Sequence, residues 1–310
     1  MTLTLNYMLL LKILSTVQVL HCNEDELTFI AIGDWGMDKA NGSVNGQLRV
    51  ADSMARWAND VNNLNFILTL GDNFYPVGTF NVTDKQYDTK WREVYINPYP
   101  SLRVDWQIVL GNHDHKLNNG KNQIEFSKFE PLWKIPNFFY SFTKELKTFQ
   151  ILFVIIDTEL MLNNSNKKEQ LTFLDKTLFN SKANWKFVAT HYPIFSTSTH
   201  GNNIELINDL RPILINNNAD FYIFGHDHVL QHLSSVANDP VDYIGSGGGS
   251  QIPYDQVQDH IEELKKWNLK SNMYGQFNGF VGFTLTKYTA TVDFIKDNGD
   301  IFYSFTRVRN

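Results

Sequence analysis

Residues 27–36 read LTFIAIGDWG, a run of uncharged, mainly apolar residues that ends in Gly and Asp. Such a run, bounded by turn-forming residues, is typical of a strand that is buried on both faces. Similar runs recur along the chain. The segments that we predict to be strands are Leu27–Ile32, Phe66–Leu70, Trp106–Leu110, Phe149–Ile156, Trp185–Ala189, Phe221–Phe224 and Asp242–Ile244.

Helical segments lie between many of these strands, and we predict them at Gln47–Val61, Gln170–Leu178 and Ile204–Asn216. Strands that alternate with helices indicate an α/β fold with much parallel pairing. After Phe277 the pattern changes to alternating strands around an Asp297-Asn298-Gly299 turn, which predicts an antiparallel hairpin. The 310 residues contain no repeat of fixed period and no Pro- or Ser-rich linker. We therefore expect a single domain over residues 23–310.

The formal net charge of −6 argues against a protein that coats nucleic acid, since binding to a phosphate backbone needs a basic face. An acidic protein that acts on phosphorylated molecules needs a local positive site instead. Bound metal ions would supply one.

The N-terminus carries an apolar stretch over residues 8–22, followed by an acidic run. This order predicts a secretory signal peptide over residues 1–22, although Lys12 interrupts it and no Lys or Arg precedes it. The alternative is a buried strand or helix. The stretch is short for a membrane span of roughly 20 residues, so we expect a product without a stable membrane span.

Cys22 is the only cysteine, which excludes cysteine nucleophiles and cysteine-based zinc sites from the mature chain. Three Asn-X-Ser/Thr sequons, at Asn41, Asn81 and Asn163, predict glycosylation in polar loops. We expect the secretory pathway, with the product either secreted or kept in an acidic compartment such as a lysosome or vacuole.

Polar residues follow five of the predicted strands directly. The five blocks are Gly33-Asp34-Trp35-Gly36, Gly71-Asp72-Asn73-Phe74-Tyr75, Gly111-Asn112-His113-Asp114-His115, Thr190-His191-Tyr192-Pro193 and Gly225-His226-Asp227-His228. A single Gly-Asp pair is explained as well by an ordinary turn. Five blocks at one edge of a sheet, where ligands of α/β proteins bind, predict a metal site instead.

In this order, the blocks resemble the signature of the calcineurin-like metallophosphoesterases, and more narrowly the small purple acid phosphatases of the tartrate-resistant type. The likeness runs from about Phe29 to Gly249. Tyr75 occupies the position that separates purple acid phosphatases from Ser/Thr protein phosphatases. The resemblance implies a four-layer α/β/β/α sandwich with two mixed β-sheets.

The resemblance also implies seven ligands for two metal ions. A ferric ion would be held by Asp34, Asp72, Tyr75 and His228, and a divalent ion (Fe, Zn or Mn) by Asp72, Asn112, His191 and His226, with Asp72 shared. The donor types fit, because carboxylate and phenolate suit a trivalent ion while imidazole and amide oxygen suit a divalent one. Two metal ions can stabilise the attacking and the leaving oxygens of a phosphoryl displacement.

The implied activity is hydrolysis of phosphate monoesters at acidic pH, with metal-bound hydroxide as the nucleophile. His113 and His200 are the expected proton donors, although His200 is also explained as a solvated loop residue. Asp114 and Asp227 lie between histidines, and we expect them to accept hydrogen bonds from imidazoles or to be ordinary turn carboxylates. The expected partners are small phosphorylated substrates or phosphoproteins, bound by a monomer. The rival interpretations are a non-catalytic scaffold and a phosphodiesterase or nucleotidase of the same fold.

Overall fold

The computed structural model describes residues 25–37, 44–61 and 63–309. The predicted signal peptide (residues 1–22), Cys22 and the sequon at Asn41 lie outside the described residues.

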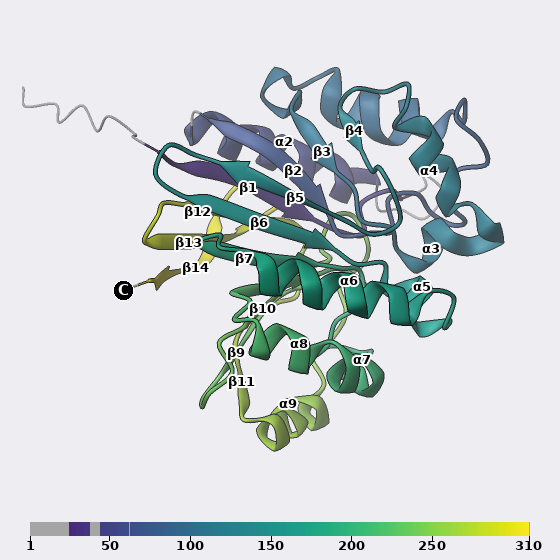
Figure 1. Cartoon of the computed structure of the whole chain (residues 1–310). Coiled ribbons are helices and arrows are strands. Elements are labelled where there is room, and N and C mark those ends of the chain that lie inside the picture. Colours follow the sequence, from purple (N-terminus) through teal and green to yellow (C-terminus); the bar gives the residue numbers. More distant parts are fainter. Residues whose placement is uncertain (1–24, 38–43, 62, 310) are drawn as a thin grey trace, which may run out of the picture.

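The strands form two seven-stranded mixed sheets (Figure 1). Sheet A has the order β14-β13-β12-β1-β2-β3-β4, and sheet B has the order β11-β9-β10-β8-β7-β6-β5. The strands of sheet A are β1 (Leu27–Ile32), β2 (Leu64–Thr69), β3 (Asp105–Gln107), β4 (Trp133–Lys134), β12 (Gly279–Leu285), β13 (Thr289–Lys296) and β14 (Ile301–Val308). The strands of sheet B are β5 (Tyr140–Glu145), β6 (Gln150–Ile155), β7 (Trp185–Ala189), β8 (Phe221–Phe224), β9 (Leu230–Ser235), β10 (Asp242–Ser246) and β11 (Leu269–Gly275).

Each sheet has a parallel part flanked by antiparallel strands. In sheet A, β1 to β4 pair in parallel, while β12, β13 and β14 continue the sheet as an antiparallel meander. In sheet B, β6, β7, β8 and β10 pair in parallel, with β5 and β9 antiparallel beside them. The carboxyl ends of the parallel strands therefore gather at one edge of each sheet.

Helices cover the outer faces of both sheets. The α-helices are α2 (Val44–Asp60), α3 (Asn112–His115), α4 (Gly120–Phe126), α5 (Thr158–Leu162), α6 (Lys167–Asn180), α7 (Ile204–Asp209), α8 (Arg211–Asn216) and α9 (Gln258–Leu264). One segment is a π-helix, η2 (Tyr87–Ile96), and three are 3-10 helices, η3 (Pro100–Leu102), η4 (Lys116–Asn118) and η5 (Lys265–Trp267). In Figure 1, α2 lies beside sheet A, and α6 to α8 lie beside sheet B.

The two sheets meet face to face through aromatic rings. Phe29 of β1 stacks between Phe66 and Phe283 of its own sheet, with ring centroids 4.9 and 4.5 Å apart. The rings of Phe153 and Phe187 from sheet B meet Phe29 edge-on at 5.2 and 5.5 Å. Aromatic side chains bury large apolar areas and favour these geometries, so this layer holds the sheets together.

Alternate residues of sheet B point away from this layer. Leu152 and Val154 of β6 pack in a second cluster with Leu174 of α6 and Leu214 of α8. Because successive side chains of a strand point to opposite faces, a strand with both faces covered must be apolar throughout. The predicted four-layer α/β/β/α sandwich with two mixed sheets is confirmed.

Three local predictions differ from the structure. The helix predicted at Ile204–Asn216 is two helices, because Pro212 has no N–H to donate and α7 ends at Asp209. The strand predicted at Trp106–Leu110 pairs only as far as Gln107. The segment Thr158–Glu169, which lies outside the predicted helices and strands, contains α5, which Asp157 caps by accepting a hydrogen bond from the backbone N–H of Leu160 at 3.0 Å.

Candidate metal centre

Three of the predicted ligands share an unusual backbone conformation. Asp34, Asp72 and His226 each follow a glycine at the end of a parallel strand, and their φ angles are 59°, 52° and 66°. This left-handed region is unfavourable for residues with a Cβ atom. Backbone strain of this kind clusters at functional sites, where it aims side chains that a relaxed turn would direct elsewhere.

One group of donors consists of Asp34, Tyr75 and His228, here called the Asp34 subsite. The Tyr75 hydroxyl donates to Asp34 Oδ1 at 3.0 Å. Nε2 of His228 lies 3.4 Å from the Tyr75 hydroxyl oxygen and 3.6 Å from Asp34 Oδ1. All three residues are buried. A carboxylate, a phenol and an imidazole therefore direct their polar atoms at a common point.

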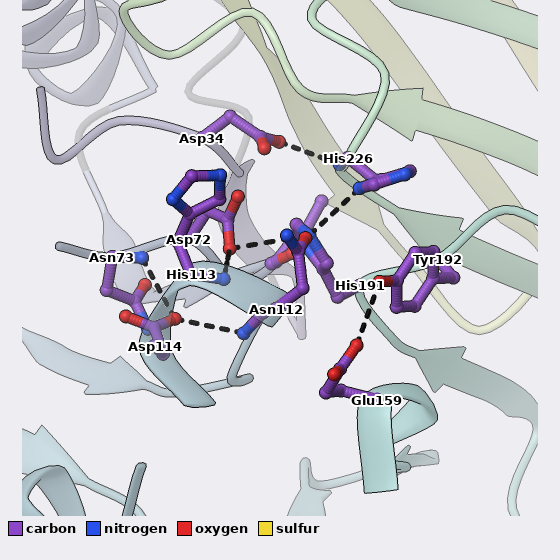
Figure 2. Close-up of polar contacts among 12 residues, drawn as sticks. Asp34, Asp72, Asn73, Asn112, His113, Asp114, Glu159, His191, Tyr192 and His226 are labelled. Carbon is purple, nitrogen blue, oxygen red and sulfur yellow. Dashed lines mark hydrogen bonds and ion pairs between the residues drawn. The ribbon is translucent and has the colours of Figure 1, made fainter. Parts of the chain in front are cut away.

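A second group consists of Asn112, His191 and His226, here called the His191 subsite. Nε2 of His191 lies 3.0 Å from Asn112 Oδ1 and 3.3 Å from His226 Nδ1. Figure 2 shows these side chains converging from separate elements.

Asp72 lies between the two groups. Its Oδ1 is 3.5 Å from His191 Nε2, and ligand atoms of Asp34, Asp72 and His191 all lie within 4.8 Å of one another. The structure thus brings together all seven residues named from the sequence.

The hydrogen bonds of His191 are compatible with a bound cation. Nδ1 of His191 lies 2.8 Å from the carbonyl oxygen of Leu70. A carbonyl only accepts, so Nδ1 carries a proton and Nε2 is the ring atom that is placed to bind a metal ion. Nε2 faces the oxygen atoms of Asn112 and Asp72, a contact that needs positive charge between these atoms, from a proton on Nε2 or from a bound metal ion. Metal-binding histidines are commonly held through their other ring nitrogen in this way.

Burial sets the protonation of the site. The pKa of Asp34 is raised well above its ordinary value by burial and by the neighbouring carboxylate of Asp72. Burial also lowers the pKa of His228 to about 4 and places that of His226 well below its ordinary value. The lowered pKa values favour the neutral imidazoles of His226 and His228, whose lone pairs can bind a metal ion, and a cation would relieve the repulsion between the carboxylates of Asp34 and Asp72.

Two glycines allow the donors to approach this closely. A Cβ atom at Gly71, where φ is 88°, would lie 2.5 Å from His191 Nδ1. A Cβ atom at Gly111 would overlap Oδ1 of Asp72. Any larger residue at either position would displace a candidate ligand.

His113 lies beside the Asp34 subsite. Its backbone N–H donates to Asp72 Oδ1 at 2.8 Å, and its ring lies 4.4 Å from the ring of Tyr75. Nδ1 lies 2.7 Å from the carbonyl oxygen of Pro76 and therefore carries a proton.

His200 lies on the other side of the centre. Its ring is 4.2 Å from that of His226, and its Nδ1 is 2.6 Å from Oδ1 of Asp227. The hydrogen bond that His200 donates to Asp227 raises the pKa of His200, and burial opposes this only in part. Asp227 therefore has an imidazole partner, as predicted, but that partner is His200 and not a neighbouring metal-site histidine.

Asp114 pairs mainly with backbone N–H groups. Its carboxylate accepts from the backbone N–H groups of Gly111, Asn73 and Phe74 at 2.9, 3.1 and 3.2 Å and from the side chain of Gln123 at 2.7 Å. These contacts agree with the alternative of a turn carboxylate: Asp114 binds the N–H of Gly111, just before α3, and two N–H groups of the segment that follows β2. It fixes the backbone on both sides of the centre.

Tyr254 is a site residue that the sequence motifs did not identify. Its ring stacks on that of His228 at 4.3 Å and lies 5.4 Å from that of His200. Burial, with the carboxylates of Asp34 and Asp227, raises the pKa of Tyr254 to about 12. The residue lies in a Pro- and Gln-containing loop without periodicity, so no local signal marks it.

Glu159 also reaches the site. It accepts a hydrogen bond from the Tyr192 hydroxyl at 2.8 Å, and the Tyr192 ring lies 4.3 Å from that of His226 (Figure 2). This contact braces the His191 subsite from the side of α5.

Comparisons with known proteins agree with this geometry. A family model described as "Calcineurin-like phosphoesterase" matches residues 27–230. The human protein named tartrate-resistant acid phosphatase type 5 is 31% identical over 295 residues, which cover 88% of each chain.

Two solved structures are similar in fold. A Plasmodium protein described as GAP50, the anchor in the inner membrane complex, superposes with a TM-score of 0.79 at 20% identity, covering 93% of this chain and 90% of that one. The purple acid phosphatase PPD1 from yellow lupin (Lupinus luteus) seeds gives a TM-score of 0.68 at 17% identity, covering 93% of this chain and 54% of that one.

Proposed function

Because the chain belongs to the calcineurin-like phosphoesterases, and within them to the purple acid phosphatases of the tartrate-resistant type, we propose that it hydrolyses phosphate monoesters with a pair of metal ions. One observation carries this proposal. Seven oxygen and nitrogen donors from five strand ends meet in two groups with Asp72 between them.

The two groups differ in charge, which supports different ions. The Asp34 subsite offers a carboxylate and a phenol, donors that suit Fe(III). The His191 subsite offers two imidazoles and an amide oxygen, which suit Fe, Zn or Mn as a divalent ion. When bound, such a pair supplies Lewis-acid activation of water and of the phosphoryl group.

His113 and His200 flank the centre and are the groups that we propose move protons. Asp227 holds His200 through Nδ1, which orients the ring and favours its protonated form. A protonated imidazole can donate to a departing alkoxide in mildly acidic solution. This supports an acidic optimum.

We further propose that residues 23–310 act as one domain behind a signal peptide over residues 1–22, in a monomer that is secreted or kept in an acidic compartment. Asn81 and Asn163 are exposed, as glycosylation requires, and their modification stays a prediction. Within the part of the chain that the structure describes, no helix is both long and apolar enough to cross a membrane.

The rival function is a metal-free scaffold. GAP50, a protein described as an anchor, has a similar fold, so the fold alone does not separate the two functions. Metal analysis of the purified protein, together with assays on p-nitrophenyl phosphate and bis(p-nitrophenyl) phosphate, distinguishes them. We expect bound metal and faster hydrolysis of the monoester. Faster hydrolysis of the diester indicates a phosphodiesterase, and absence of both metal and hydrolysis indicates the scaffold.

A further inference from the structure

The exposed side chain of Lys116 lies beside His113, at the edge of the metal centre. Its Nζ is 3.0 Å from His113 Nδ1 and 3.2 Å from His113 Nε2. No carboxylate among the described residues forms an ion pair with Lys116. In a protein of net charge −6, a lysine at this position adds positive charge beside the site.

The contact with His113 leaves Lys116 free for a stronger partner. Nδ1 of His113 donates to Pro76, so Nε2 is the only ring atom that can accept from the ammonium group. A hydrogen bond from an ammonium group to an anion is stronger than one to a neutral imidazole. An anionic group on a ligand should therefore be a stronger partner for Lys116 than His113 is.

The turn that carries Lys116 is anchored on both sides. Before it, Nε2 of His115 lies 2.7 Å from Oδ2 of the buried Asp157. After it, the side chain of Asn119 donates to the carbonyl oxygen of Val77 at 2.7 Å. Leu117 and Asn118 have φ angles of 56° and 61°, so two consecutive residues adopt the left-handed conformation here. These contacts hold the backbone of Lys116 in a defined position beside the metal centre.

We propose that Lys116 selects phosphomonoesters that carry a second anionic group close to the scissile phosphate. This inference rests on the proposed phosphatase function and adds a substrate class to it. The scissile phosphate lies at the metal centre, and the second anion, one side chain further out, pairs with the ammonium group of Lys116.

A matched pair of substrates tests the proposal. Glycerol 2-phosphate and 2-phosphoglycerate have the same ester and differ only in a hydroxymethyl group against a carboxylate. We expect the ratio of kcat/KM for 2-phosphoglycerate over glycerol 2-phosphate to fall about fivefold in Lys116→Met, the upper end for a solvent-exposed ion pair. Lys116→Arg should keep most of the ratio, because it keeps the charge.

Lys270→Met is the control, since it removes the same charge from an exposed position on β11. Lys270 is at the end of β11 that lies away from the metal centre, because it pairs with Ser234. The opposite end of β11, at Gly275, pairs with Leu230, which closely follows His228 in the sequence. We expect the substrate ratio of this variant to equal that of the wild type. An unchanged ratio in Lys116→Met, or an equal fall in Lys270→Met, overturns the proposal.

A binding measurement separates this inference from the proposed function. Phosphonoacetate and 2-hydroxyethylphosphonate also differ in a carboxylate against a hydroxymethyl group, and neither contains an ester that can be hydrolysed. Calorimetry of the metal-loaded protein measures the affinity for each. We expect phosphonoacetate to bind more tightly to the wild type and to lose that advantage in Lys116→Met. If the protein hydrolyses neither ester, the proposed function fails, and this affinity difference alone decides whether Lys116 recognises the second anion.

Discussion

The Nδ1 atom of His200 donates to Oδ1 of Asp227 across 2.6 Å, and this carboxylate is buried while the histidine is partly exposed. The other carboxylate oxygen of Asp227 has no hydrogen-bond partner among the described residues. Among the described residues, the Asp227 carboxylate therefore accepts a hydrogen bond from a single group, the imidazole of His200 at the edge of the metal centre.

This pair predicts a pH effect. Asp227 raises the pKa of His200, so protonated His200 is present below that raised pKa and is lost as the pH rises through it. In Asp227→Asn, the pKa of His200 is no longer raised, so the protonated form of His200 should be lost at a lower pH. We expect kcat/KM to fall about tenfold near neutral pH and less in mild acid, measured as a full pH–rate profile. Asp175→Asn, a surface change on α6, is the control, and an Asp227→Asn profile that coincides with the control contradicts a role for His200.

His113 should affect turnover without affecting metal binding. We expect His113→Ala to lower kcat by about 100-fold, as removal of a proton donor does. The contact between residue 113 and Asp72 is made by the backbone N–H, so it survives the substitution. Elemental analysis should find the metal content unchanged. Loss of metal in this variant would make His113 a ligand instead of a proton donor.

Gly71 should be required for metal binding, because a Cβ atom there meets His191. Gly299, in the β13–β14 turn, has a φ of 96°, and its Cβ would meet only the flexible guanidinium group of Arg56. We expect Gly299→Ala to lower the free energy of unfolding by about 1–2 kcal/mol, from urea titration, through its backbone conformation. Gly71→Ala should lower it further, because its Cβ also lies 2.8 Å from backbone atoms of Gly111. Only Gly71→Ala should lose metal. Equal metal contents in the two variants would contradict the close approach of Gly71 to His191.

Tyr75 should determine the colour of the protein. A phenolate bound to Fe(III) gives a broad visible absorption, so we expect a purple or pink wild-type protein and a colourless Tyr75→Phe variant. An absorption spectrum with elemental analysis checks both. A colourless wild type that contains iron would contradict a bond between Tyr75 and Fe(III), and one that contains only zinc or manganese would remove the ferric assignment.

Much of the fold could be predicted from short apolar runs. The predicted bounds of β1, β7 and β8 are those of the structure, because strands with both faces covered must be apolar along their whole length. The strand-end donors could also be predicted, since parallel strands bring residues such as Asp34 and Asp72 to the same edge. These features depend on local sequence and on one topological rule.

What could not be predicted depends on contacts between distant segments. Tyr254 stacks on His228 from a loop with no motif. The partner of Asp227 was expected nearby in the sequence, whereas His200 lies 27 residues away. Hydrogen-bond partners across the fold leave no periodicity for sequence reasoning to detect.

The account depends on two metal ions lying on either side of Asp72. An anomalous difference map from crystals of the native protein, collected at an X-ray energy above the absorption edges of Mn, Fe and Zn, tests this directly. We predict two peaks about 3.5–4 Å apart, one at the Asp34 subsite and one at the His191 subsite, with Asp72 touching both. A single peak, no peak, or peaks away from Asp72 would contradict the proposed two-metal centre.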